Sequence, residues 1–260
     1  MEKIKVFLSD PQVLFREGIH FTLSAEEDFE VTGESTNNEE AFAFIETNPP
    51  NIVIMNIKDG KDGPTVTRRI KRNFPSVSVM LVVDKDEEDM LFLAAKCGAS
   101  AYLTKDIDPE YLLDLIRVVA QGSQPIIESL LMPTLASRIL EEFEATSPLR
   151  EQLSNVMSHL SSRESEILSS ITAGNDIEQI GASLGCDEET IRKTLRSILI
   201  KLAANDQARA VIELAHKGLP STAPSVDYSM KYVTKKEFDE FKETLSEHFR
   251  SLISESHKII

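Results

Sequence analysis

The strongest chemical signal in the chain is a set of basic side chains at helical spacing in its second half. Large aliphatic residues recur there every three or four positions, as they do on the buried side of an amphipathic helix. The basic residues fall between them, where arginine and lysine can contact phosphates and read base edges. The aliphatic residues are Ile191, Leu195, Ile198 and Leu202, and the basic ones are Arg192, Lys193, Arg196 and Lys201.

Other kinds of chemistry have little support in the sequence. The chain contains 2 cysteines, Cys97 and Cys186, which lie far apart, so we expect no disulfide framework and a reducing cytoplasm. The 5 histidines show none of the spacings of metal ligands, and we expect neither a metal site nor a cofactor. These histidines are His20, His159, His216, His248 and His257.

The charge of the chain is unevenly distributed. A net charge of -15 argues at first against a nucleic-acid partner. Residues 1–123 carry -9 of it, however, and residues 160–218 carry only -2, so a local basic face is compatible with the second half. The sequence contains no apolar run of about 18 residues, and we expect no membrane span. Met1 leads directly into a strand-like segment, which indicates no signal peptide.

The first 121 residues alternate short apolar runs with helical patterns. Continuous apolar strands that alternate with helices predict an α/β fold, a doubly wound parallel sheet of five strands covered on both faces. Functional side chains in such sheets lie at the carboxyl ends of the strands. The expected strands are Ile4–Leu8, Phe29–Ser35, Ile52–Met55, Val77–Val83 and Ala101–Leu103, and the expected helices are one opened by Pro11, then Asn38–Glu46, Thr65–Asn73, Asp86–Cys97 and Pro109–Gln121.

Three stretches of this first half resemble the receiver domains of NarL/FixJ-type response regulators. They are Val6–Pro11 with Arg16–Ile19, Ile52–Ile57, and Glu87–Asp89 followed by Gly98–Asp106. The resemblance covers residues 1–121 and implies a flavodoxin-like receiver. In this family an acid pair and an acceptor aspartate hold Mg²⁺, and the aspartate takes the phosphoryl group. A hydroxyl and a lysine then bind the phosphoryl oxygens.

The residues at the matching positions depart from that chemistry. The acid pair is Ser9-Asp10, the acceptor position is Asn56, and the hydroxyl position is Val83, while Lys105 matches the family lysine. An amide is a poor nucleophile, so the resemblance implies a receiver-like domain that is not phosphorylated at this position. A competing interpretation moves the acceptor to Asp59 or Asp62, but a side chain three residues along the loop would not line up with Lys105. We expect Lys105 to pair with Asp10.

A second surface of the receiver-like domain is implied by the same resemblance. The family uses the residues that match about 86–121 for dimerisation and output contacts. Tyr102 occupies the aromatic position that normally responds to the hydroxyl group, and here it is either such a residue or a plain half-buried aromatic. The acidic run Asp84–Asp89 fits a solvated helix start, where the helix dipole favours acids.

Residues 160–202 resemble a LuxR-type helix-turn-helix domain, within an all-helical block at 160–218. Ser161 or Ser162 is expected to cap the first helix, Gly185 to form the turn, and Asp187 to cap the recognition helix. The recognition helix of such a motif enters the major groove. The acidic start at Asp187–Glu189 departs from the family and leaves a protein partner as the alternative. The residues expected to face DNA are Thr190, Arg192, Lys193, Thr194 and Arg196, with Lys201 nearer the backbone.

The chain continues about forty residues beyond the point where this family usually ends. Pro220–Ser225 is typical of a linker, and a helix is expected from about Thr234 to Ser254. One side of this helix is apolar, which predicts either dimerisation or partner capture, or packing on its own chain. The apolar residues are Phe238, Phe241, Leu245, Phe249 and Leu252.

Together these features predict four regions along the chain. They are a receiver-like domain at 1–122, a helical linker at 123–158 with apolar Leu131, Leu135, Ile139 and Phe143, a four-helix DNA-binding domain at 159–219, and a linker with a terminal amphipathic helix at 220–260. The predicted function is transcription regulation by a cytoplasmic DNA-binding homodimer that acts without aspartate phosphorylation and is not an enzyme. The alternative is an adaptor that binds a protein instead of DNA.

Overall fold

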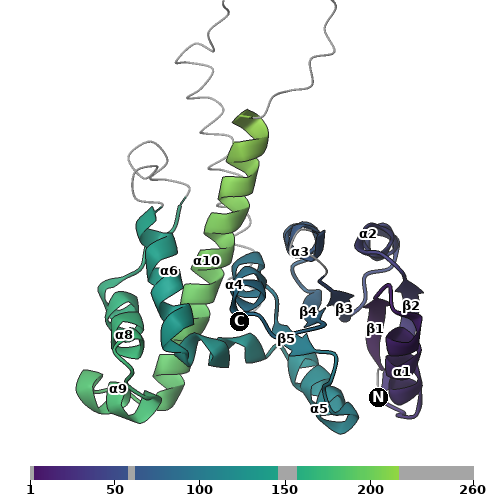
Figure 1. Cartoon of the computed structure of the whole chain (residues 1–260), viewed down its shortest axis with the longest axis horizontal. Helices are drawn as coiled ribbons and strands as arrows, with labels where there is room; N and C mark the ends of the chain where they lie inside the picture. Colours follow the sequence, from purple (N-terminus) through teal and green to yellow (C-terminus); the bar gives the residue numbers. More distant parts are fainter. Residues whose placement is uncertain (1–2, 58–61, 146–156, 217–260) are drawn as a thin grey trace, which may run out of the picture.

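The computed structural model describes residues 3–57, 62–145 and 157–216 (Figure 1). Its first half is built on one sheet of 5 strands in the order β2-β1-β3-β4-β5, and every neighbouring pair is parallel. This confirms the predicted α/β class. The strands are β1 (Ile4–Ser9), β2 (Phe29–Ser35), β3 (Ile52–Asn56), β4 (Ser78–Val83) and β5 (Ala101–Thr104).

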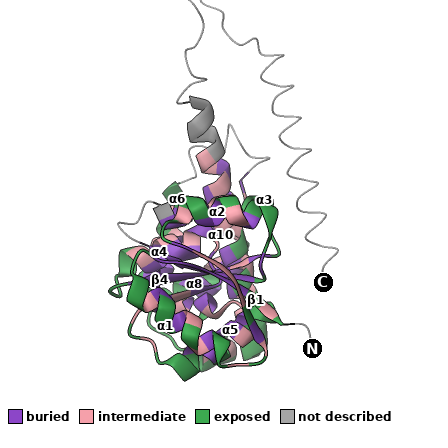
Figure 2. Cartoon of the chain, turned by 90° about the vertical axis from the view of Figure 1, so that its right-hand side faces the viewer, coloured by how far each residue is buried: buried purple, intermediate pink, exposed green. Residues whose placement is uncertain are grey.

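Helices cover both faces of the sheet, so β3 is buried along its whole length, and β1 and β4 are buried over their carboxyl-terminal parts. One face packs against α1 (Val13–Ser24) and α5 (Pro109–Ala120). The other packs against α2 (Asn38–Thr47), α3 (Asp62–Asn73) and α4 (Glu88–Cys97). Figure 2 shows the buried residues along the sheet and on the inward sides of these helices.

The ends of these helices follow from local hydrogen bonding. The Asn37 side chain accepts from the Glu40 amide at the start of α2, and Asp108 accepts from Glu110 and Tyr111 at the start of α5. The prediction that Pro11 opens the first helix is wrong by two residues. The Gln12 amide donates to the Asp10 carboxylate at 2.7 Å, and Gln12 is extended, so α1 begins at Val13.

The connector between the two halves is helical, as predicted, but it is not one helix. A 3-10 helix, η1 (Pro125–Leu131), comes first, and Pro133 then starts α6 (Pro133–Ala145). Proline is favoured in a first helical turn because it has no amide hydrogen to donate. Leu135, Ile139 and Phe143 of α6 are buried, and Leu131 is partly buried against the same core.

The second half begins with a helix-turn-helix. Ser161 caps α8 (Ser162–Thr172) and Asp176 caps α9 (Ile177–Leu184), each in a reciprocal capping box with the third helical residue. Gly185 has φ 62, a left-handed conformation that glycine adopts without strain, and it turns the chain into α10 (Glu188–His216). Of the two predicted caps, Ser161 and Ser162, the structure has Ser161, and the predicted Gly185 turn and Asp187 cap are confirmed.

The expectation of four separate helices in this domain is wrong. The recognition helix and the expected fourth helix are one continuous α10 of 29 residues, which is about 43 Å at the usual rise per residue. Neither glycine nor proline occurs between Glu188 and His216, and Ala203, Ala204 and Ala208 favour a helix across the expected break.

The two halves share one hydrophobic core. The cluster on the α2–α3–α4 side of the sheet continues without interruption through η1 and α6 into the inner faces of α8, α9 and α10. The predicted stripe of Ile191, Leu195, Ile198 and Leu202 is buried in it. Within the described residues, no helix is both long enough and apolar enough to cross a membrane.

Candidate functional site

The structure brings the five receiver-like positions to one edge of the sheet. Ser9 and Asn56 end β1 and β3, Val83 ends β4, and Asp10 and Lys105 directly follow β1 and β5. In a parallel sheet these carboxyl ends lie on the same side. We call Ser9, Asp10, Asn56, Val83 and Lys105 the strand-end cluster.

The Lys105 ammonium is held between two carboxylates. Its Nζ lies 2.8 Å from Asp10 Oδ2 and 2.9 Å from Asp84 Oδ1. The predicted pair with Asp10 is confirmed, whereas Asp84 was missed, although a carboxylate directly after a strand end could have been noted as a candidate. The side chains of Lys105 and Asp10 are nearly buried and that of Asp84 is half exposed. Ionised partners on both sides fix the ammonium in place.

The Asn38 side-chain amide links the acceptor position to Ser9. Ser9 Oγ donates to Asn38 Oδ1 at 2.9 Å, and Asn38 Nδ2 donates to the Asn56 carbonyl at 3.0 Å. Asn56 itself is 5% exposed, and its Nδ2 has no hydrogen-bond partner within the described part of the chain. It borders a cavity of about 10 Å³, which is about the space that one water needs.

The remaining position offers no polar group at all. Val83 is buried in the core with Met55 and Ile57. Across residues 3–57, 62–145 and 157–216, no group of three or more His, Cys, Asp or Glu side chains is arranged to hold a metal ion. The alternative acceptors were Asp59 and Asp62. Asp59 lies outside the described residues, and the structure does not describe the side chain of Asp62.

A chain of polar contacts runs from this cluster to the surface of α1. Arg16 Nη1 donates to the Asp10 carbonyl at 2.7 Å, and its Nε pairs with Glu34 at 2.7 Å. Glu34 also pairs with His20. Burial raises the pKa of Glu34, but hydrogen bonds from His20 and Arg16 outweigh it and hold that pKa below its ordinary value. The sequence gives no signal for this network of contacts, because no spacing rule connects residues of α1 with residues of β2.

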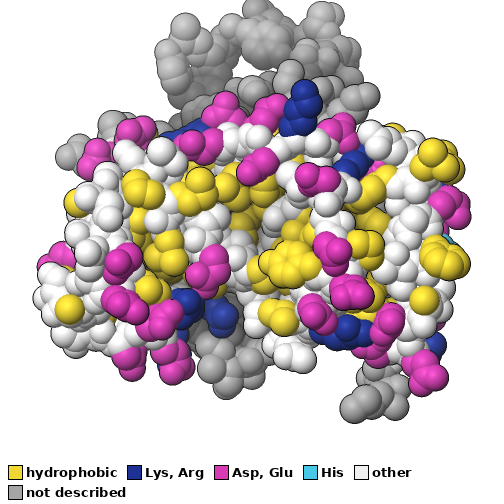
Figure 3. All heavy atoms as spheres, turned by 60° about the horizontal axis from the view of Figure 1, so that its bottom comes forward, with side chains coloured by type: hydrophobic (Ala, Val, Ile, Leu, Met, Phe, Trp, Pro, Cys, Tyr) yellow, Lys and Arg dark blue, Asp and Glu magenta, His cyan; other side chains and the backbone are white. Residues whose placement is uncertain are grey.

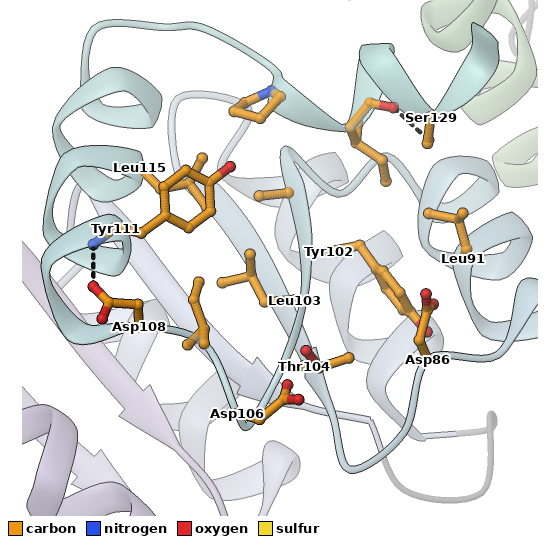
Figure 4. Close-up of a pocket in the computed structure, with 14 residues that line it drawn as sticks. Asp86, Leu91, Tyr102, Leu103, Thr104, Asp106, Asp108, Tyr111, Leu115 and Ser129 are labelled. Carbon is orange, nitrogen blue, oxygen red and sulfur yellow. Dashed lines mark hydrogen bonds between the residues drawn. The ribbon is translucent and has the colours of Figure 1, made fainter. Parts of the chain in front are cut away.

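A hollow of about 490 Å³ lies over β5 between α4 and α5 (Figure 4). Tyr102 and Tyr111 stand in its walls, and Asp86, Asp106 and Asp108 lie at its margin. The Tyr102 hydroxyl donates to the Glu87 carbonyl and accepts from the Glu87 amide, both at 3.3 Å, and burial raises the pKa of this phenol. Tyr102 is thus a half-buried aromatic fixed to the loop before α4.

The basic residues of the recognition helix are largely paired within the chain. Arg192 Nε lies 2.8 Å from Glu128 of η1, and its Nη1 lies 2.5 Å from Glu188. Hydrogen bonds to Glu128 and then Glu188 raise the pKa of Arg192. Lys193 pairs with Glu189 at 2.8 Å on an exposed surface. The acidic helix start thus neutralises the neighbouring basic residues.

Part of the predicted DNA-binding face looks toward the receiver-like domain. Arg192 and Arg196 line a second hollow of about 430 Å³, which we call the α5 hollow. Its other walls are Tyr111, Asp114, Leu115 and Val118 of α5, then Ser123–Pro125 with Ile127 and Glu128. Figure 3 shows the face that carries these elements, with hydrophobic side chains along its depression and acidic ones around it.

The other residues predicted to face DNA differ in their exposure and in their hydrogen-bond partners. Thr190 and Lys193 are exposed, and the Thr194 hydroxyl donates to the Thr190 carbonyl at 2.8 Å. Lys201 is turned inward instead: its ammonium lies 2.6 Å from the buried Glu164 carboxylate and 3.0 Å from the His159 carbonyl. In this arrangement Lys201 fixes α10 to the start of α8. The predicted terminal stripe, Phe238, Phe241, Leu245, Phe249 and Leu252, lies outside the described residues.

Comparison with known proteins gives two family matches along the chain. Residues 6–117 match the response regulator receiver domain, and residues 158–214 match the luxR family of bacterial regulatory proteins.

Individual relatives match over both halves. The transcriptional regulatory protein DegU of Brevibacillus brevis is 30% identical over 228 residues, which are 83% of this chain and 94% of DegU. The response regulator protein VraR of Staphylococcus aureus is 28% identical, over 80% of this chain and 95% of VraR. Among solved structures, the signal receiver domain of NarL from Mycobacterium tuberculosis is 27% identical with a TM-score of 0.45, over 47% of this chain and 99% of that domain.

Proposed function

The chain belongs to the response regulators that join a receiver domain to a luxR-type helix-turn-helix domain, and on that premise we propose a transcription regulator that binds double-stranded DNA without aspartate phosphorylation. We further propose that it binds as a homodimer in the cytoplasm and is not an enzyme. The curated relatives are named as transcriptional regulatory proteins and response regulators, and none of these names describes an enzyme.

The observation that carries the DNA proposal is the α9–Gly185–α10 unit. Two capped helices meet at a left-handed glycine, and the first turns of α10 present Thr190, Lys193 and Arg196 on their exposed side. A helix that presents basic and hydroxyl side chains in this way suits the major groove, where arginine bonds guanine and lysine contacts phosphates.

The proposal of phosphorylation independence is supported by the strand-end cluster. An amide occupies the acceptor position, and Ser9 Oγ is hydrogen-bonded to Asn38 instead of offering a carboxylate. Lys105 is already neutralised by Asp10 and Asp84, so an incoming phosphoryl group would have to displace a carboxylate. A domain of this kind transmits a signal through binding or through a change in its packing.

The dimer proposal is supported by the size of the DNA-binding unit. Recognition by a single helix-turn-helix is usually strengthened by a second copy on an adjacent half-site. The terminal stripe from Phe238 to Leu252 supplies the apolar residues that we propose for this pairing, because burial of large apolar side chains between two subunits lowers the free energy of the complex.

A mobility-shift experiment with the full chain and mixed-sequence duplex DNA tests the central proposal. We expect binding at about 50 mM salt that weakens steeply as salt rises, because phosphate contacts release counterions. If the DNA does not shift at that salt concentration, the intact chain does not bind DNA and the proposal is refuted.

One observation favours the alternative adaptor function. Arg192 is paired with Glu128 and Glu188, and the hollow around Tyr102 is rimmed by aspartates, so the described surface also suits a basic protein partner. A chain that binds no duplex DNA, even after the two halves are separated by mutation, would support the adaptor.

A further inference from the structure

The hollow over β5 has the size and the apolar lining of a small-molecule site. Its volume of about 490 Å³ lies within the range of about 300–1,000 Å³ that is usual for ligand pockets. Leu103 of β5, Leu115 of α5 and Ile126 of η1 belong to its lining, and each is less than a tenth exposed. An apolar part of a ligand that leaves water for this lining stabilises the complex.

Two tyrosines stand in the walls of the hollow (Figure 4). Tyr102 is fixed to the loop before α4, because its hydroxyl both donates to and accepts from the Glu87 backbone at 3.3 Å. Tyr111 is 58% exposed, and its backbone amide donates to Asp108 Oδ1 at 3.1 Å at the start of α5. Aromatic rings attract organic cations through the negative charge of their faces. The walls thus suit a ligand that carries a positive charge.

The margin of the hollow carries negative charge without a matching cation. Asp86, Asp106 and Asp108 lie there, and none of the described residues that line the hollow is a lysine, arginine or histidine. Within the described part of the chain, the Asp106 side chain has no hydrogen bond or ion pair. Lys105, its neighbour in sequence, does not offset this charge, because its ammonium is held between two other carboxylates. The hollow therefore repels anions and attracts cations.

The shape of the hollow favours a small molecule over a protein. A stable protein interface buries about 800 Å² on each partner and extends over about 20–30 residues of each. Only 14 described residues line this hollow, and they enclose a single volume between α4, α5 and η1. A concave site with an apolar lining and a few polar groups at one side is typical of small-ligand binding.

We propose that this hollow binds a small organic cation, a protonated or quaternary amine carried on an apolar body. The ammonium lies at the aspartate margin beside the tyrosine rings, and the apolar body lies on the buried side chains of the lining. No residue of the strand-end cluster lines the hollow, so the two sites are separate. The inference does not depend on DNA binding and goes beyond the proposed function.

The test uses the full-length protein and three probes of similar size and different charge. They are phenylbutylammonium, phenylbutanol and phenylbutyrate, which are cationic, neutral and anionic. The chain contains 4 tyrosines, so fluorine NMR of protein labelled with fluorotyrosine gives few signals. Tyr102→Phe and Tyr111→Phe assign the two signals from the hollow.

Phenylbutylammonium is expected to shift the Tyr102 and Tyr111 signals saturably, with a Kd in the millimolar range because the probe is small. It should bind about tenfold more tightly than phenylbutanol, since the carboxylates and the tyrosine rings both favour the cation. Phenylbutyrate should bind more weakly than either. Added salt should weaken only the binding of the cation, because salt screens exposed charges.

Asp106→Asn removes one carboxylate of the margin, and Glu110→Gln is the matched control. Glu110 carries the same charge nearby but does not line the hollow, and both side chains are exposed, so both variants should fold. Asp106→Asn should weaken binding of phenylbutylammonium about threefold to fivefold and leave phenylbutanol binding unchanged. The control should match the wild type with both probes.

Three results would overturn the proposal. In the first, phenylbutylammonium leaves the Tyr102 and Tyr111 signals unshifted. In the second, phenylbutylammonium and phenylbutanol bind with equal affinity, which would make the site merely apolar. In the third, Asp106→Asn and Glu110→Gln weaken binding equally, which would attribute the preference to the overall charge of the chain instead of the hollow.

Discussion

Lys105 Nζ lies 2.9 Å from Asp84 Oδ1, which gives this lysine a second carboxylate partner beside Asp10. Asp84 immediately follows β4, so its carboxylate lies beside the lysine that follows β5. Together with Asp10, it leaves the ammonium with two anionic partners before any ligand arrives. The charge of Lys105 is thus matched by carboxylates of the chain itself.

Treatment with acetyl phosphate should leave this chain unmodified at position 56, and Mg²⁺ should bind weakly. The reason is that Asn56 offers no carboxylate nucleophile and Ser9 no metal ligand. Intact-protein mass spectrometry checks the result, with an authentic receiver domain as the positive control. A stoichiometric acid-labile phosphate within residues 1–121 would contradict it.

Replacement of Lys105 by methionine should destabilise the fold by about 3 kcal/mol, because it leaves the nearly buried Asp10 carboxylate without its cation. The matched change Asp84→Asn removes a half-exposed partner of the same ammonium and should cost less than about 1 kcal/mol. Urea denaturation of both variants measures the difference. Equal losses would show that the Asp84 pair, and not the burial of Asp10, accounts for the stability that Lys105 contributes.

Changes on the recognition helix should separate base reading from phosphate contact. Arg192→Ala is expected to weaken specific DNA binding by about 1–3 kcal/mol if the guanidinium reads a base. Arg196→Ala should weaken binding more evenly across sequences and flatten its salt dependence. Titrations at several salt concentrations distinguish the two patterns. Lys201→Ala should also weaken DNA binding evenly across sequences, and the loss of its ion pair with Glu164 should lower stability, so its melting point is measured alongside.

The stability of the chain should depend on Lys71 at alkaline pH. Burial lowers the pKa of Lys71 to about 8, while its ammonium donates to the Pro75 and Val77 carbonyls at 2.9 Å each. The unfolded chain, with a lysine pKa near 10.4, then binds more protons than the folded chain between about pH 8 and 10.4. Stability relative to Lys71→Met should therefore rise with pH across that window and stay flat below it. A flat difference throughout would mean that Lys71 is not desolvated.

Truncation after Ser221 should lower both the dimer fraction and the DNA affinity. The expectation follows from the stripe of Phe238, Phe241, Leu245, Phe249 and Leu252, whose burial contributes roughly 1.5–3 kcal/mol for each side chain. Light scattering on both chains decides it. If the truncated chain is still a dimer, the interface lies on the receiver-like domain. If the full-length chain is a monomer, the terminal segment packs on its own subunit.

Periodic and local signals in the sequence predicted most of the fold. The stripe of Ile191, Leu195 and Ile198, the glycine turn and the capping residues are short-range patterns, and the structure has them where the sequence indicates. The continuity of α10 was missed, although the absence of glycine and proline from Glu188 to His216 was visible. The expectation of a separate fourth helix came from the family resemblance and not from the residues of this segment.

The contacts that α10 makes with the connector and with the receiver-like half had no signal in the sequence. Arg192 pairs with Glu128 across 64 positions, and Arg68 pairs with Asp206 across 138. Periodicity reports which side of a helix is buried but not which charged residue of a distant element it meets. The α5 hollow and the Arg68–Asp206 pair are therefore visible only in the folded chain.

The separation of Arg68 from Asp206 also bears on how the protein is made. A ribosome adds about 5–20 residues per second, so the 138 positions between them take on the order of 10 s to synthesise. During that interval the α3–α4 edge has emerged without α10 to cover it. Arg68 and Lys96 on that edge are then without the Asp206 carboxylate that pairs with them in the finished fold, so this contact between distant elements forms only after α10 has been synthesised.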